Sequence, residues 1–184
     1  MAITGITGFK CIRWQNSKWV SPAKKSFTWD SSVVWASCRV CPLDDEGHII
    51  ISEVHSCGIY ATLRDDELLD YMRDEFAVAL LLEALGHGVN ITVSGQRHSQ
   101  IWAHTHGFTA SGVLVVGVIN LSKFGQEFRP FEYQTIREGK QQLVMKMASN
   151  FFKAPIMDYQ TARIITQKTW TKEGLEWPME IPKL

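Results

Sequence analysis

The sequence predicts an α+β fold, in which a mixed or antiparallel, partly barrel-like sheet is covered by one long amphipathic helix and followed by a C-terminal helical appendage. Short segments rich in aromatic and β-branched residues fill the first third of the chain, a helical pattern follows over residues 64–88, and the character changes again after Phe131. With 184 residues, 45% of them hydrophobic, the chain can bury the core of one large domain. We expect a core domain over residues 1–130, with residues 131–184 packed on it as helices and an extended tail.

The N-terminal third predicts several short strands. Segments 8–14, 18–21 and 32–38 are rich in aromatic or β-branched residues and are separated by turn-forming stretches, and residues 49–51 and 58–63 read as two more strands. Four of the seven tryptophans precede residue 36. We interpret them as hairpin and core packing, with a stacking platform for bases or sugars as the alternative.

The strongest helical pattern covers residues 64–88. Its apolar stripe recurs at helical spacing through Leu68, Met72, Phe76, Leu80 and Ala84. Acidic residues load the first turn, where the helix dipole favours negative charge, and two glycines near residue 88 offer a stop. We expect this helix to cover the sheet.

Strands follow one another in the next part of the chain. Residues 89–94 alternate between apolar and polar, residues 101–104 predict a strand, and 112–121 are almost entirely apolar, which is typical of a central strand buried on both faces. Because no helix intervenes, the pairing should be antiparallel or mixed. Helical spacing then resumes over 136–151, and Asp158 can cap a short second helix. An extended tail is expected from Trp170.

Charge and hydropathy disfavour two classes of partner. Lys+Arg and Asp+Glu both count 19, so the basic excess typical of proteins that bind long nucleic acids is missing. The longest apolar stretches fall far below the roughly 18 residues of a membrane span, and the N-terminus lacks a signal-peptide pattern. We therefore expect a cytoplasmic protein, with its cysteines as thiols or metal ligands in a reducing compartment.

Three of the four cysteines belong to the sharpest motif, Cys38, Cys41, His55 and Cys57. A Cys-x2-Cys pair followed by a His-x-Cys pair supplies three thiolates and one imidazole, which is the ligand set of a structural zinc site. Gly58 would supply the bend that the second pair needs. The competing interpretation is that Cys38 and Cys57 are small buried hydrophobic residues and His55 an ordinary histidine.

Two weaker patterns point to catalysis. His104 and His106 project to one face of a strand and would hold a metal if His98 or His55 supplied a third ligand, although no carboxylate lies near them to act as a base. Cys57 is a candidate nucleophile, with His55 two residues before it and His104 or His106 approaching across the sheet. The alternative is a hydrogen-bonded turn histidine and an inert thiol.

Two segments carry a resemblance to other proteins. His-Ser-Cys-Gly-Ile-Tyr-Ala at 55–61 and His-Thr-His-Gly-Phe-Thr-Ala at 104–110 resemble a group of uncharacterised small bacterial and phage proteins with a Cys-Gly-Ile-Tyr-Ala core and a His-x-x-Gly-aromatic segment. The resemblance spans about residues 5–156. It implies an origin among bacteria and mobile elements and a location in the bacterial host cytosol, and nothing about chemistry.

These observations favour a non-enzymatic binding protein, although they leave enzymatic activity undecided. It would be an accessory or anti-defence protein of a phage or mobile element that occupies a partner protein or sequesters a small ligand. One alternative is a small hydrolase that depends on a metal or on Cys57. The other is a nucleotide or modified-base reader. For a nucleotide-like ligand, the candidate contacts are Trp14, Trp35, Tyr60, Trp102 and His106.

Overall fold

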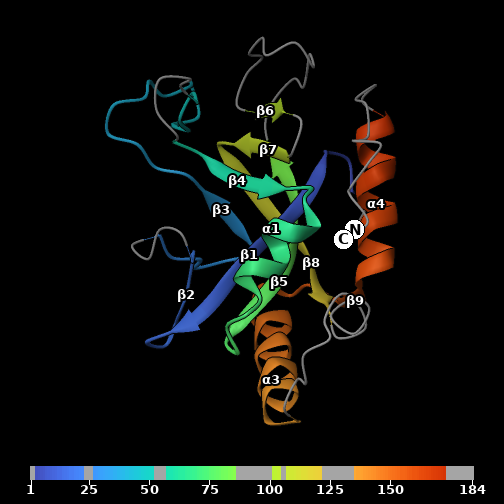
Figure 1. Ribbon diagram of the computed structural model, residues 1–184. Helices are drawn as coiled ribbons and strands as arrows, with labels where there is room; N and C mark the ends of the chain where they lie inside the picture. The colour runs from blue at the N-terminus through green and yellow to red at the C-terminus, as the bar shows by residue number, and fades with distance from the viewer. Residues whose placement is uncertain are drawn as a thin grey trace.

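A computed structural model describes residues 3–22, 27–51, 57–85, 101–104, 107–121 and 135–172 (Figure 1). These residues form an α+β structure, as predicted. Its strands are β1 (Thr7–Gln15), β2 (Lys18–Val20), β3 (Val33–Trp35), β4 (Ile59–Thr62), β5 (Ala77–Leu85), β6 (Ile101–His104), β7 (Gly107–Ala110), β8 (Gly112–Asn120) and β9 (Ile156–Asp158). Its helices are α1 (Asp65–Tyr71), α3 (Thr135–Phe152) and α4 (Tyr159–Lys172).

All nine strands belong to one sheet. The hydrogen-bonded order is β3-β8-β5-β1-β4-β7-β6, with β2 beside β1 and β9 beside β8. Every pairing is antiparallel except that of β8 with β9, so the sheet is mixed, as one of the two predicted forms. The path from β3 to β6 is open, so the predicted barrel-like closure is not found among the described residues.

The N-terminal hairpin forms where the turn residues predicted it. Asn16 and Ser17, between β1 and β2, both have positive φ, at 50° and 60°, which is the backbone of the turns that match strand twist. Trp14 and Trp19 face each other across the hairpin with ring centroids 4.9 Å apart. Residues 49–51 are no strand, because only the single bridge from Leu43 to Ile49 forms there. The strand predicted at 89–94 lies outside the described residues.

The prediction of one long helix over residues 64–88 is wrong. Helix α1 ends at Tyr71, and the chain then runs as β5 from Ala77 to Leu85. A run that is apolar at nearly every position fits a buried helix and a strand buried on both faces equally well, so spacing does not separate them. The segment forms a strand because it pairs with β1 on one side and with β8 on the other. These two pairings satisfy the backbone hydrogen-bonding groups along the whole length of β5.

Strand β5 is buried on both faces because helices cover the sheet from both sides. Val78 and Leu80 face the cluster that α3 covers, and Ala79 and Leu81 face the opposite cluster, which α1 and α4 cover. One core includes Val144, Met145, Ala148 and Phe152 of α3 with Trp170 of α4, and the other includes Leu68 of α1, Met72 directly after that helix, and Tyr159 and Ala162 of α4. The fold is therefore a sheet between two helical layers, with its hydrophobic core divided by β5.

The last described helix lies beside the first strand (Figure 1). Trp170 donates its indole N–H to the carbonyl of Thr7 at 2.8 Å, and the hydroxyls of Thr7 and Thr166 are 3.0 Å apart. Asp158 accepts the backbone N–H of Thr161 at 2.9 Å, as the predicted cap does. Trp170 is thus helical and buried, contrary to the extended tail predicted from that residue, and residues 173–184 lie outside the described part. No helix among the described residues is long and apolar enough to cross a bilayer.

We predict that Leu80→Ala and Leu81→Ala each lower the free energy of unfolding by roughly 2–5 kcal/mol, because both side chains are fully buried on opposite faces of β5. Phe76→Ala is the control, because Phe76 is exposed here but central to the apolar stripe of the helix that the sequence predicted. Urea unfolding measures all three. A large loss for Phe76→Ala together with a small one for Leu81→Ala would contradict the strand.

Candidate metal centre

One bend in the sheet brings together the two ends of the segment that carries the cysteines. Ser111 alone separates β7 from β8, and the backbone N–H of Ala36 donates to its carbonyl at 2.7 Å. On the other side of the bend, Ile59 pairs with Ala110 at the start of β4. The chain therefore leaves β3 and returns to β4 at nearly the same place, which puts Cys38 and Cys41 close to Cys57.

Gly58 permits this close return. A Cβ atom at this position would lie 2.4 Å from the Cγ2 atom of Thr109 and 3.2 Å from the carbonyl oxygen of Ala110. Any other residue would push β4 away from β7 at the point where Cys57 enters the cluster. The glycine that the sequence singled out is thus required by close approach.

The three cysteines form a compact group of sulfur atoms. The Sγ atoms of Cys38, Cys41 and Cys57 all lie within 4.8 Å of one another, and those of Cys41 and Cys57 are 2.9 Å apart. Cys41 and Cys57 are buried, whereas Cys38 is half-buried. Cys41 and Cys57 form a small satellite core together with Ile49 and Ile51.

The sulfur atoms differ in their surroundings. Cys38 accepts the backbone N–H of Val40 at 3.4 Å, and this hydrogen bond, with another from the N–H of Cys41, lowers the pKa of the Cys38 thiol. The thiol of Cys41 shares a hydrogen bond with Cys57, which together with burial raises its pKa to about 12. Three sulfurs this close repel one another as thiolates, and a divalent cation among them would remove that repulsion.

The group fits zinc in ligand type and in size. With Zn–S bonds of about 2.3 Å, the sulfurs of a tetrahedral site lie about 3.8 Å apart, so all three Sγ atoms are near enough to share an ion, and those of Cys41 and Cys57, 2.9 Å apart, would separate to admit it. Three thiolates favour a soft metal over Ca²⁺ or Mg²⁺. The fourth predicted ligand, His55, lies outside the described residues but only two positions before Cys57. The three cysteines could therefore hold a zinc ion, and His55 stays the predicted fourth ligand.

A second histidine, which the sequence prediction missed, lies nearby. The rings of His48 and Trp35 stack with centroids 3.4 Å apart and planes 6° apart. A turn orients His48, because the side chain of Asp44 accepts the backbone N–H groups of Glu46 and His48 at 3.0 and 2.8 Å. Among the described residues His48 is not part of the sulfur group, since its Nδ1 faces Glu46 at 3.6 Å. The Asp-Asp-Glu-Gly run at 44–47, which is typical of a turn, was the feature of the sequence that could have predicted how His48 is held.

The predicted aromatic contacts do not form one cage among the described residues. Trp14 packs on Trp19 in the hairpin, Trp35 stacks on His48, and Tyr60 donates its hydroxyl to Glu67 at 3.3 Å. Trp35 and Trp102 lie on β3 and β6, which end the strand order on opposite sides. His106 and His98 lie outside the described residues.

The strand registers also separate Cys57 from His104. On β6, His104 pairs with Gly107 of β7, and Gly107 in turn pairs with Thr62 of β4. His104 is therefore level with Thr62, the last residue of β4. Cys57 precedes Thr62 by five residues, about 16 Å along an extended strand. The arrangement places the Cys57 thiol against another thiol, and the backbone position of His104 gives it no evident role as the base of a cysteine nucleophile.

No protein-family model matches the chain, and no curated protein and no solved structure is significantly similar to it. The resemblance through residues 57–61 to small bacterial and phage proteins stays a prediction.

We predict that the protein binds one zinc ion per chain, and that Cys41→Ser lowers zinc affinity by more than the roughly 10–100-fold that loss of an outer-shell partner costs. Chelation should lower the melting temperature of the wild type strongly, because metal binding contributes folding energy. Elemental analysis and thermal unfolding of protein purified without metal-affinity resin measure both effects.

Cys11→Ser is the matched control for the loss of a thiol. Cys11 is buried away from the group, against Met72, and its substitution should keep the zinc and cost about 1 kcal/mol. His106→Ala should also keep it, whereas His55→Ala should release it. Protein that is free of metal and indifferent to chelator would show that the three thiols meet without a metal.

Proposed function

We propose that the protein is a non-enzymatic binding protein in which a zinc ion on Cys38, Cys41, His55 and Cys57 holds the segment after β3 against the sheet, where it contacts a protein partner. The observation that carries this proposal is the distribution of exposed apolar side chains. Five of the eleven large hydrophobic residues that are exposed in the described part fall within residues 33–50. They are Val33, Trp35, Val40, Leu43 and Ile50.

Apolar side chains exposed in one stretch are typical of interaction sites. Val40 is 79% exposed although it stands between two zinc ligands, in a segment that the cysteines tie down. A loop held by a metal can keep such side chains exposed. The metal cross-link orders the loop, so the loop does not need to bury these side chains to be stable. The stretch is therefore ordered for contact by the cluster beneath it.

The charges beside this stretch indicate the chemistry of the partner. Asp45 and Glu46 are exposed in the turn that orients His48, next to Leu43 in the chain. β3 is also an end strand of the sheet, so its outer edge carries no strand among the described residues. Arg39 in the same stretch is exposed as well, so these features suit a protein surface with an apolar centre and a rim that carries both charges, basic where it faces Asp45 and Glu46.

The surroundings of Cys57 support binding over catalysis. A nucleophilic cysteine is activated by an adjacent base or cation, but the Cys57 thiol is buried against that of Cys41. A role as a zinc ligand explains the same residue, its neighbour and the spacing of the motif together. The resemblance to small phage and bacterial proteins extends the proposal to an accessory or anti-defence protein of a mobile element, acting in the host cytosol by occupying its partner.

Site-specific photo-crosslinking tests this function. A photoreactive phenylalanine derivative is placed at Leu43 in one variant and at Leu143 in another, because both side chains are 59% exposed and Leu143 lies on α3. In cells of the natural host, we expect a discrete protein adduct from position 43 and none from position 143. Zinc content and melting temperature should equal those of the wild type in both.

The adduct at position 43 should disappear when Val40→Asp is added and persist when Phe151→Asp is added at another exposed apolar site. An adduct that forms equally at both positions would contradict a binding surface at residues 33–50. Turnover of a substrate that Cys57→Ala abolishes while the fold remains would contradict the non-enzymatic part of the proposal.

A further inference from the structure

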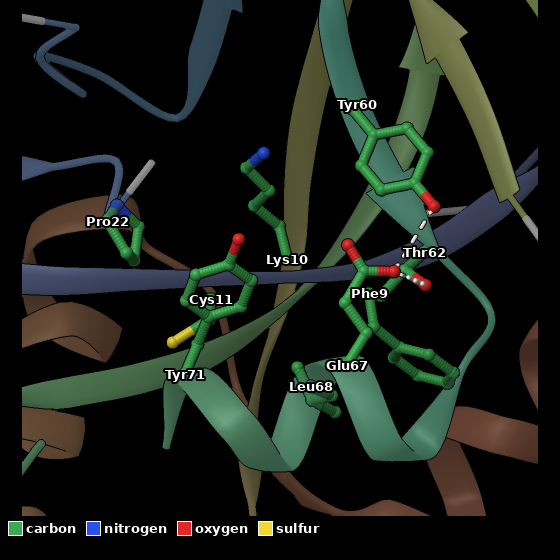
Figure 2. Close-up of a pocket in the computed structure, with 9 residues that line it drawn as sticks. All are labelled: Phe9, Lys10, Cys11, Pro22, Tyr60, Thr62, Glu67, Leu68 and Tyr71. Carbon is green, nitrogen blue, oxygen red and sulfur yellow. Dashed lines mark hydrogen bonds between the residues drawn. The ribbon is translucent and has the colours of Figure 1, made fainter. Parts of the chain in front are cut away.

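A pocket of about 150 Å³ opens where strands β1 and β4 separate (Figure 2). These strands pair only at Phe9 and Thr62, and beyond that rung each goes to another neighbour. Helix α1 closes the gap from below with Leu68 and Tyr71, and Pro22 and Tyr60 stand at its two sides. The pocket shares no residue with the metal centre or with residues 33–50.

Lys10 supplies a positive charge to this pocket. Its side chain rises from β1 between Pro22 and Tyr60, and its Nζ lies 5.8 Å from the centroid of the Tyr60 ring. Among the residues that the structure describes, Lys10 makes no ion pair. Burial lowers the pKa of Lys10, and the nearby carboxylate of Glu67 offsets only part of this effect.

Glu67 supplies a fixed negative charge on the opposite side. Its Oε2 accepts the hydroxyl of Thr62 at 2.8 Å and that of Tyr60 at 3.3 Å. Thr62 is in turn held by the backbone N–H of Arg64, which donates to its hydroxyl at 3.0 Å. Both of these hydrogen bonds use Oε2, and the other carboxylate oxygen faces the pocket (Figure 2). The carboxylate is therefore locked in place with one oxygen directed at a ligand.

The two charges face one pocket without forming an ion pair with each other. A ligand that satisfied both would carry an anionic and a cationic group close together, with apolar atoms directed at Pro22 and the ring of Tyr71. A cavity of about 150 Å³ holds a molecule of about the size of benzene, so the ligand is a small metabolite. Charge, size and apolar lining together describe a free amino acid with a short aliphatic side chain.

We propose that this pocket binds a small aliphatic α-amino acid, with its carboxylate at Lys10 and its ammonium group at Glu67. The aliphatic side chain packs on Pro22 and Tyr71, which are the more exposed apolar side chains of the lining. Tyr60 positions Glu67 by its hydrogen bond, and burial raises the pKa of Tyr60, so its hydroxyl stays protonated as a donor. This inference goes beyond the proposed binding to a protein partner. It assigns the binding of a small ligand to a separate part of the fold.

Titration calorimetry with L-valine and two matched analogues tests the proposal. 3-Methylbutanoate lacks the amino group of valine, and isobutylamine lacks its carboxylate. We expect L-valine to bind at least tenfold more tightly than either analogue, because only the zwitterion meets both charges. Lys10→Met and Glu67→Gln should each weaken valine binding by roughly 10- to 150-fold, the range for one hydrogen bond to a charged group.

The two variants should also separate the two ends of the ligand. Lys10→Met should leave the weak binding of isobutylamine unchanged, and Glu67→Gln should leave that of 3-methylbutanoate unchanged. Lys140→Met is the control, since Lys140 also lies over an aromatic ring, that of Phe76 at 5.5 Å, but on the outside of the protein. It should bind valine as the wild type does.

Two results would overturn the proposal. One is equal affinity for valine and 3-methylbutanoate, which would make the pocket a plain anion site, and the other is the absence of saturable valine binding at millimolar concentration. The test is independent of the proposed protein partner, because Val40→Asp should leave valine binding unchanged. Failure of one proposal therefore leaves the other standing.

Discussion

Burial of β5 on both faces is the constraint on which the rest of the structure depends. A strand that is apolar in both directions must be covered twice, so helix α3 packs on one face of the sheet while α1 and α4 pack on the other. β1 and β8 flank it and complete the backbone hydrogen bonds. With both faces used for the core, functional groups are left to the margins of the sheet. The cysteine group forms at its bend, and the pocket forms where two of its strands part.

The cysteine group answers an energetic problem that the sheet does not solve. Within residues 36–51 the buried hydrophobic side chains are only those of Cys41, Ile49 and Ile51, which offset little of the conformational entropy lost when the segment is ordered. A structural zinc ion adds its binding free energy to folding. The metal would therefore hold a segment that exposes Val40 and Leu43 and buries little. The same zinc ion would stabilise the segment and keep its apolar side chains exposed for a partner.

The sequence predicted those features that depend on neighbours in the chain. The β1–β2 turn, the cap at Asp158, the buried strand β8 and the grouping of Cys38 and Cys41 with Cys57 all follow from local residue types and spacing. Residues 77–85 were misassigned because an unbroken apolar run has no period, and only pairing with β1 and β8 reveals the strand. The sequence did not show that Trp35 and Trp102 belong to strands at opposite ends of the sheet order. Lys10 and Glu67 gave no signal, because their meeting depends on how β1 and β4 diverge.

X-ray absorption at the zinc edge tests the central claim most directly, since it measures the ligands of the metal in the intact protein. Our account predicts three sulfur ligands at about 2.3 Å and one nitrogen ligand at about 2.0–2.1 Å for the ion bound at unit stoichiometry. The spectrum of Cys11→Ser should be identical, and that of Cys57→Ser should lose a sulfur shell or the metal. A first shell of nitrogen and oxygen alone, or zinc bound without sulfur from Cys38, Cys41 and Cys57, would contradict it.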